Sequence, residues 1–293
     1  MSTRTITAGV DGSRAGLDAA DWAAREAERR RLPLRLLHAG TDPAAPAPLP
    51  DVDLPARAPL DRAAIQLSYA HPRLDIIARR TDTPAIPALL AAAAEAELTV
   101  LGSRGLTGFA GFLVGSVALA VTAAAERPVV LVRAGELPED ERMPAVDGTP
   151  PGRTPYLPVV LGLDLDRPAD ELLAYAFETA ATRSAPLHVV HTWTVPPPRG
   201  YAPGVAVPGD VAEKEDGSLR VLTHTLQPWR HKFPELTVTE HVVYGHPGHH
   251  LLKASTRAGL LVVGRRAKAT GLGRAAHALI HHATCPVAVV PHS

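Results

Sequence analysis

The chain repeats itself, and this internal duplication limits its possible folds more than any other feature. Residues 6–40 align with residues 159–193 at a constant offset of 153 positions, without a gap. A second match joins residues 98–102 with residues 260–264. A repeat of about 140 residues is too long for a solenoid, so the sequence predicts one domain fold that occurs twice. Aligned positions that share a residue include Gly9 with Gly162, Asp11 with Asp164, Arg14 with Arg167, Arg30 with Arg183, and His38 with His191.

Each half alternates short apolar strands with helical stretches. The strands are continuous runs of Val, Ile and Leu, which is typical of a parallel sheet covered on both faces. Strand–helix alternation predicts right-handed crossovers and an α/β fold with a doubly wound sheet. We therefore expect two tandem Rossmann-like domains, each with a five-stranded parallel sheet. In the first half, strands are expected at 6–10, 34–38, 74–79, 98–101 and 129–133, and helices at about 14–31, 60–70, 85–96 and 115–125.

The length of 293 residues accommodates two domains of about 100–200 residues each. A proline-rich, acidic stretch after residue 135 is typical of a linker. The sequence thus predicts a first domain at 1–135, a linker at 136–156 and a second domain at 157–293.

A glycine-rich segment follows the predicted strand at 98–101. Gly102 and Gly105 come first, and after nine intervening residues Gly115-Ser116 opens a helix. Glycines let backbone N–H groups approach an anion closely, and a helix N-terminus adds partial positive charge. This order of strand, loop and helix predicts a phosphate cradle and a nucleotide ligand. It is not a Walker loop, because no Gly-Lys-Ser/Thr occurs in the chain.

A second polar segment is expected at the same edge of the sheet. Ligands of such sheets bind beyond the carboxyl ends of the strands, where the strand order reverses. Asp11 and Gly102 each follow a predicted strand, so both fall on that edge. Asp11-Gly12-Ser13 is also good turn chemistry on its own. The convergence of two segments favours nucleotide contact by Asp11 over a turn role alone.

The spacing Gly-x2-Gly-x9-Gly-Ser after a late strand resembles the ATP-binding signature of the universal stress protein family. Residues 6–13 resemble that family's first strand and acidic loop, and residues 128–132 its closing strand. The resemblance covers most of residues 4–135, with weaker echoes over 157–291. It implies ATP as the ligand, and it leaves open whether Mg²⁺ or Mn²⁺ accompanies it.

The resemblance can be carried over position by position in the first half. It implies adenine and ribose contacts at Gly9, Val10 and Asp11, an adenine-pocket residue at Ala39, base and ribose contacts at Leu101 and Gly102, and a triphosphate loop of Arg104, Gly105, Gly115, Ser116 and Val117. A carboxylate at position 11 can accept from an amino or hydroxyl group, and Arg104 can add charge-assisted contacts to phosphate.

The second half departs from this pattern. Gly264 is kept, but Ala267 replaces the second glycine, and Gly273-Arg274 stands in place of the final Gly-Ser. Eight residues separate Gly264 from Gly273, against twelve in the first half. A shorter loop with an added Cβ cannot wrap a triphosphate in the same way. We expect the second domain to bind ATP weakly or not at all.

No residue pattern predicts catalysis or a metal site. The sequence lacks a nucleophile–base–acid set, and Gly115-Ser116 is typical of an anion-binding helix start instead of a nucleophile elbow. His277 and His281 have the i, i+4 spacing that can hold a metal, but no further ligand pattern accompanies them. A structural or solvent-facing role is favoured for this pair.

Charge and apolar patterning bear on partners and location. The chain has 30 basic and 30 acidic residues, which gives no electrostatic reason to expect nucleic acid or an anionic membrane. No apolar run reaches the roughly 18 residues of a membrane span, and no apolar leader is present. A single cysteine, Cys285, excludes an intrachain disulfide. We expect a soluble cytoplasmic protein.

The resemblance implies an intrachain pseudo-dimer in which the final strands, 128–133 and 286–291, pair across a two-fold axis. It also implies a nucleotide-dependent regulatory switch in stress or dormancy adaptation, read by an unknown protein partner. Two alternatives stay open, a slow ATPase or nucleotidyl-transfer enzyme and a nucleotide-independent protein-interaction module. Further association into a homodimer is also open.

Overall fold

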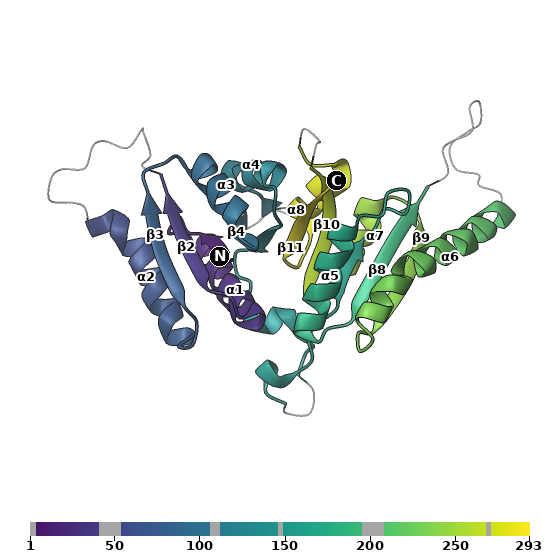
Figure 1. Cartoon of the computed structure of the whole chain (residues 1–293), viewed down its shortest axis with the longest axis horizontal. Helices are drawn as coiled ribbons and strands as arrows, with labels where there is room; N and C mark the ends of the chain where they lie inside the picture. Colours follow the sequence, from purple (N-terminus) through teal and green to yellow (C-terminus); the bar gives the residue numbers. More distant parts are fainter. Residues whose placement is uncertain (1–3, 41–53, 106–111, 146–148, 195–207, 268–270) are drawn as a thin grey trace.

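A computed structural model describes residues 4–40, 54–105, 112–145, 149–194, 208–267 and 271–293 (Figure 1). The elements of the first half are β1 (Ile6–Gly9), α1 (Arg14–Arg30), β2 (Leu34–Ala39), α2 (Leu54–Ala70), β3 (Ile76–Thr81), α3 (Ala85–Glu95), β4 (Leu98–Gly105), β5 (Phe112–Leu113), α4 (Ser116–Ala124) and β6 (Val129–Arg133). Those of the second half are β7 (Val159–Gly162), α5 (Asp170–Arg183), β8 (Leu187–Trp193), α6 (Pro208–Lys232), β9 (Val238–Tyr244), α7 (Pro247–Ser255), β10 (Leu260–Arg266), α8 (Arg274–His282) and β11 (Val287–His292). Two 3-10 turns, Pro138–Glu141 and Pro151–Arg153, lie between the halves.

The two halves share one sheet, with the strand order β3-β2-β1-β4-β6-β11-β10-β7-β8-β9. Within each half the five strands of this order are parallel. The halves meet where β6 pairs antiparallel with β11, for example Val130 with Ala288. The expected α/β fold and the pairing of the two final strands are therefore confirmed. Antiparallel β5, which extends β4, is not expected from the sequence.

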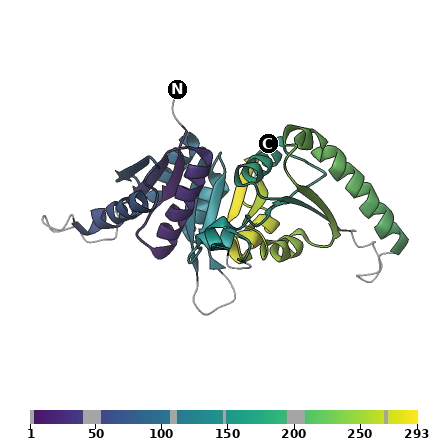
Figure 2. The same cartoon turned by 90° about the horizontal axis from the view of Figure 1, so that it is seen from below.

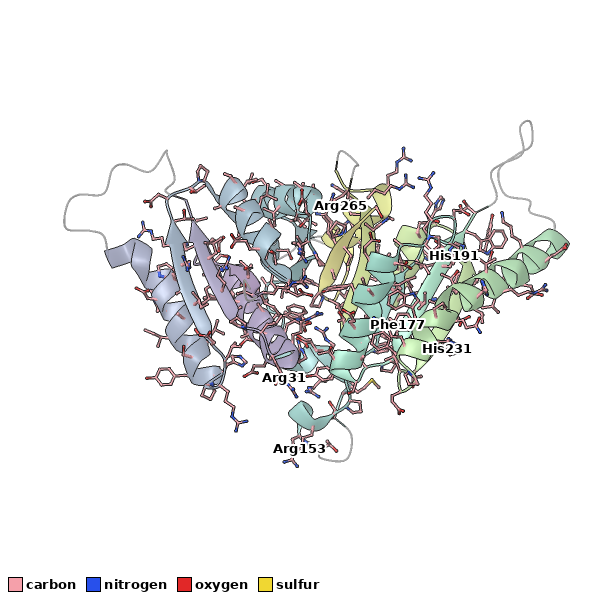
Figure 3. The ribbon with its side chains drawn as sticks, in the orientation of Figure 1. Arg31, Arg153, Phe177, His191, His231 and Arg265 are labelled. Atoms are coloured by element: carbon pink, nitrogen blue, oxygen red, sulfur yellow. The ribbon has the colours of Figure 1, made fainter. Side chains whose placement is uncertain are left out.

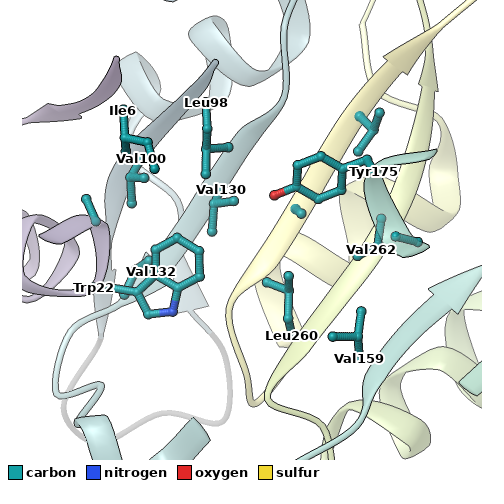
Figure 4. Packing of buried hydrophobic residues seen from close by; sticks show 14 of the residues in the cluster. Ile6, Trp22, Leu98, Val100, Val130, Val132, Val159, Tyr175, Leu260 and Val262 are labelled. Carbon is teal, nitrogen blue, oxygen red and sulfur yellow. The ribbon is translucent and has the colours of Figure 1, made fainter. Parts of the chain in front are cut away.

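The helices cover both faces of this sheet (Figure 2). One apolar cluster lies on the α1, α2, α5 and α6 face and runs without a break through both halves. A second cluster lies beneath α3, α4, α7 and α8. Figure 4 shows Trp22 of α1 and Tyr175 of α5 at the seam, with valines of β6 beside the tryptophan. The core is thus a single structure across the duplication.

The helix α1 is built for close approach to the sheet. Ser13 caps it by accepting from Gly16 N–H at 3.1 Å, and Arg31 ends it in the left-handed conformation. The residues that face the sheet are mostly alanines, and all are buried (Ala15, Ala19, Ala20, Ala23, Ala24 and Ala27). Small side chains bring the helix backbone near the strands, so the start of α1 lies against the end of β4.

The contact between α1 and α5, the seam of the two halves, is formed by residues at aligned positions of the duplication. Arg183 stacks over the Trp22 ring at 5.4 Å, and Arg30, its aligned counterpart, stacks over Tyr175 at 5.5 Å. The same two arginines reach across to aligned positions, Arg30 to Thr179 at 2.9 Å and Arg183 to Glu26 at 2.8 Å. Glu26 thus supplies a carboxylate where the second half has a hydroxyl.

No helix in the described part of the chain is long and apolar enough to cross a membrane.

Candidate nucleotide-binding site

The first half contains a cavity of about 610 Å³ where β1 and β4 end. Its walls come from β1, β2, β4, the loop before α1, and the starts of α3 and α4. Nine of the eleven residues predicted from the sequence line it, namely Gly9, Val10, Asp11, Ala39, Leu101, Gly102, Gly115, Ser116 and Val117. Segments more than a hundred residues apart in the chain therefore meet at the switch in strand order, between β1 and β4.

Arg104 and Gly105, the other two predicted residues, follow Leu101 and Gly102 within β4. Their backbone lies at the end of β4, where Arg104 pairs with Leu113 and Gly105 with Phe112 of β5. The Arg104 side chain, and the loop at 106–111, fall outside the described residues. The predicted triphosphate contact of Arg104 stays a prediction.

Asp11 takes part in a turn through one carboxylate oxygen, and its other carboxylate oxygen is able to accept a hydrogen bond from a ligand. Its Oδ1 accepts from Ser13 N–H at 2.9 Å and from the Ser13 hydroxyl at 2.5 Å. Within the described residues, its Oδ2 accepts no hydrogen bond. The turn expected from Asp11-Gly12-Ser13 is present, and an exposed acceptor remains at the rim of the cavity.

Part of the cavity wall is apolar, and the backbone beside it is fixed by hydrogen bonds. Leu37, Ala39, Leu89 and Leu101 line it from three different elements. The neighbouring backbone of Val10 is fixed on both sides, because its N–H donates to Leu37 O at 2.9 Å and its carbonyl contacts His38 Nδ1 at 2.7 Å. A flat apolar group would find a preformed surface here.

The start of α4 supplies unsatisfied donors. Gly115 is its N-cap, in extended conformation, and Gly115 O accepts from Leu119 N–H at 2.9 Å. The amides of the first turn, at residues 116–118, have no acceptor within the helix. No acidic residue lies in that turn, and Ser116 and Val117 both line the cavity. Donors and the helix dipole together favour an anion.

The glycines of the motif serve different purposes. A Cβ at Gly102 would collide with the backbone of Ala15 and lie 2.8 Å from Gly16 N. A Cβ at Gly115 would meet no atom within 4 Å. Glycine at 102 is therefore required by the packing of α1 on β4. Glycine at 115 has no such reason within the described residues and leaves open space at the cavity.

Sequence reasoning missed several lining residues. Ser13 and Gly16 belong to the cap of α1, and Leu37, Ala85 and Leu89 belong to the apolar wall. The capping pattern Ser-x-x-Gly directly after Asp11 could have indicated the first two. The apolar residues give no signal of their own, because their sequence pattern is that of ordinary core positions.

The second half has a cavity of about 580 Å³ at the equivalent place. The aligned residues Gly162, Asp164, Gly264 and Gly273 line it. Gly273 is the N-cap of α8, in the extended conformation also found at the start of α4. The duplication therefore preserves the cavity as well as the fold, although its glycine loop differs.

Two histidines of α8 have the spacing of a metal-binding pair. The rings of His277 and His281 lie 4.7 Å apart. In the part of the chain that the structure describes, no group of three His, Cys, Asp or Glu residues is arranged to hold a metal ion.

A parallel, doubly wound sheet with a cavity at its switch point identifies each half as an α/β domain with a candidate ligand site. The model of the universal stress protein family matches residues 2–133 and again residues 155–291. The chain therefore belongs to the universal stress protein family and carries its domain twice.

Known proteins resemble this chain in sequence or in fold. A universal stress protein of Mycobacterium tuberculosis is 29% identical over 286 residues, which cover 91% of this chain and 88% of that protein. A universal stress protein from Archaeoglobus fulgidus matches in fold, with a TM-score of 0.71, 17% identity and 100% of both chains covered. One solved structure that matches 46% of this chain, and is covered completely, is a universal stress protein in complex with cAMP, at 24% identity and a TM-score of 0.35.

Proposed function

We propose that the first half binds ATP in the cavity at the ends of β1 and β4. The observation that supports this best is the lining of that cavity, which combines an apolar wall, the free Oδ2 of Asp11 and the open first turn of α4. An adenine ring suits the apolar wall, a ribose hydroxyl or amino group can donate to Asp11, and phosphates suit the helix start. The volume of about 610 Å³ is sufficient for a nucleotide.

In this proposal, ATP occupancy acts as a regulatory switch in stress or dormancy adaptation. Family membership supports the physiological part. A switch of this kind requires that a partner protein binds the ATP-loaded and ATP-free forms with different affinity. The second half binds ATP weakly or not at all, because its loop lacks the second glycine and is four residues shorter.

A titration with radiolabelled ATP and Mg²⁺ tests the site. The Gly115→Ala methyl would occupy open space at the proposed phosphate position, so it should weaken ATP at least about tenfold. Gly273→Ala is the matched control, because Gly273 is also an N-cap whose added Cβ meets no atom within 4 Å. We expect one ATP per chain in the wild-type protein and in the control. Two equal ATP sites, or equal losses in the two variants, would contradict the proposal.

A further inference from the structure

Arginine side chains line the second-half cavity. Three arginines line it, Arg167, Arg265 and Arg266, against a single carboxylate, Asp164. Among the described residues that line the first-half cavity, the only charged side chain is that of Asp11. The second-half cavity, which has nearly the same volume, therefore presents three arginines to a ligand.

Arg265 is the unusual member of this set. It is 4% exposed, and Arg183 is the other buried arginine in the described chain. Arg183 has a carboxylate partner, Glu26, at 2.8 Å. The Arg265 guanidinium instead donates to two carbonyl oxygens, those of Ala125 and Arg266, and its Nε has no partner within the described residues.

A buried cation without a carboxylate is costly unless another negative charge compensates it. Ala125 is the C-cap of α4, so its carbonyl contributes only the partial charge of a helix end. Burial lowers the pKa of Arg265, and no acidic group offsets this. Figure 3 shows Arg265 at the end of the sheet opposite to Arg31 and Arg153, which is the end where the cavity opens.

The other two arginines leave their charge available to a ligand. Arg167 and Arg266 are exposed, and neither forms an ion pair within the described residues. Asp164 is partly engaged, because its Oδ1 accepts from Asp166 N–H at 3.1 Å. The His292 ring packs against Gly264, 2.8 Å from where a Cβ would stand, and it closes that side of the cavity.

We propose that the second-half cavity binds the oligophosphate group of a small anion through Arg167, Arg265 and Arg266, without requiring a nucleoside. Guanidinium groups bind phosphate oxygens with strong, bidentate hydrogen bonds. The first turn of α8, which follows Gly273 and contains no acidic residue, adds backbone donors beside them. Two hydroxyl groups also line this cavity, those of Thr192, which stands where the first half has Ala39, and Thr194. This site is independent of the proposed ATP site.

Calorimetric titration with tripolyphosphate at about 0.15 M salt tests the proposal, and the screening at this ionic strength suppresses weak surface binding. The protein carries Gly115→Ala to weaken binding at the first-half site. We expect one tripolyphosphate per chain, and a loss of about a hundredfold in Arg167→Gln/Arg266→Gln, or about tenfold for each arginine. Because both side chains are exposed and unpaired, the melting temperature should not change. Arg220→Gln/Arg257→Gln, two exposed arginines outside the cavity, is the charge-matched control and should stay within about twofold.

Several outcomes would overturn the proposal. They are no binding of tripolyphosphate, equal losses in the two double variants, and binding of ATP that is lost in Arg167→Gln/Arg266→Gln and is tighter than the binding of tripolyphosphate. The last result would mean that the nucleoside is required and that the cavity is an ordinary second nucleotide site. If instead ATP fails to bind the wild-type chain, the proposed function fails, and the tripolyphosphate titration still decides the matter for the second half.

Discussion

At the scale of single residues, the same amino acid is required for different physical reasons within one motif. Gly102 gives the backbone of α1 room against β4, whereas Gly115 borders open space at the cavity. Gly102 is therefore needed for the stability of the fold, whereas Gly115 is proposed to matter for the binding of a ligand.

Alanine substitutions at these two glycines should lower stability to different extents. Gly102→Ala forces a Cβ into the backbone of Ala15 and should lower the free energy of unfolding by roughly 1–3 kcal/mol. Gly115→Ala should cost under about 1 kcal/mol, the difference between glycine and alanine as an N-cap. Urea unfolding of the two variants measures both values. Equal destabilisation would show that Gly115 is also a packing residue.

The surroundings of Glu136 predict that its carboxyl group affects the pH dependence of stability. Glu136 is 8% exposed and lines a small polar cavity of about 300 Å³ between the halves, beside Arg133, Asp140 and the buried thiol of Cys285. Burial, with added repulsion from Asp140 and Glu141, raises the pKa of Glu136 to about 8, although Arg25 and Arg133 oppose this. The folded protein therefore binds a proton that the unfolded chain releases near pH 4.5.

Since the native state binds the extra proton, Glu136 lowers stability as pH rises from about 4.5 through 8. Glu136→Gln should remove this loss and raise the free energy of unfolding by roughly 2–4 kcal/mol at pH 9 relative to wild type. Chemical unfolding at pH 5 and pH 9 provides the comparison. If the free energies of unfolding of the two proteins differed by the same amount at both pH values, the raised pKa of Glu136 would be refuted.

At the scale of elements, the contact of α1 with α5 depends on buried charge. Glu26 is fully buried, and Arg29, Arg30 and Arg183 each lie within 3.0 Å of its carboxylate oxygens. Burial alone would raise the pKa of Glu26, but the three arginines outweigh it and lower the pKa to about 2. Removing one member of such a cluster leaves the others without compensation.

Glu26→Gln should therefore destabilise the protein by about 3–5 kcal/mol at pH 7. In the wild type, the stabilisation by this carboxylate is present above about pH 4.5 and is lost as pH falls through about 2. The variant should lack that part of the acid transition. The exposed pair of Glu178 with Lys232 at 3.8 Å gives a control, since Glu178→Gln should cost under about 1 kcal/mol. Similar losses in both variants would argue against the buried cluster.

Most helices and strands of the first half are predictable from the sequence, but the contact between α1 and α5 is not. The continuous apolar runs locate every strand of the parallel sheet within about two residues at its start, and Asp11 with Ser13 locates the start of α1. The sequence underestimates α2, which begins at Leu54 instead of about residue 60, because the Pro55 and Pro59 that it contains argue against a helix there. The cluster around Glu26 depends on how two helices from aligned segments pack, and no local pattern records that.

The candidate site is predictable for the same reason as the strands. Polar and glycine-rich segments that follow parallel strands must meet at one edge, so nine of the eleven predicted residues line one cavity. The arginines of the second cavity were not predictable, because they belong to no motif. Arg167 follows β7, Arg265 and Arg266 end β10, and only the fold brings the two segments together.

At the scale of the whole molecule, the duplication has produced one cooperative structure. The sheet is continuous through β6 and β11, and one apolar cluster includes residues of both halves. Arginines also cross the seam, since Arg133 donates to Ala283 O at 3.2 Å and Arg265 donates to Ala125 O. Each half alone would therefore expose apolar residues that the other half covers.

We therefore expect both halves to unfold in a single transition. Trp22 reports on the first half and Trp193 and Trp229 on the second, so variants with one half's tryptophans replaced by phenylalanine allow each half to be followed by fluorescence. The two urea midpoints should coincide with each other and with circular dichroism, at any protein concentration. Separate midpoints would show that the halves are independent domains joined by a weak contact.

The most direct test of the central claim is the amount of ATP that the purified protein carries. The protein is prepared without added nucleotide and denatured, and the ATP released per chain is measured. The account predicts close to one ATP per chain, lost in Gly115→Ala and kept in Gly273→Ala. No released ATP, together with no binding on titration with Mg²⁺, would contradict it, and two ATP per chain would contradict the assignment of the site to the first half alone.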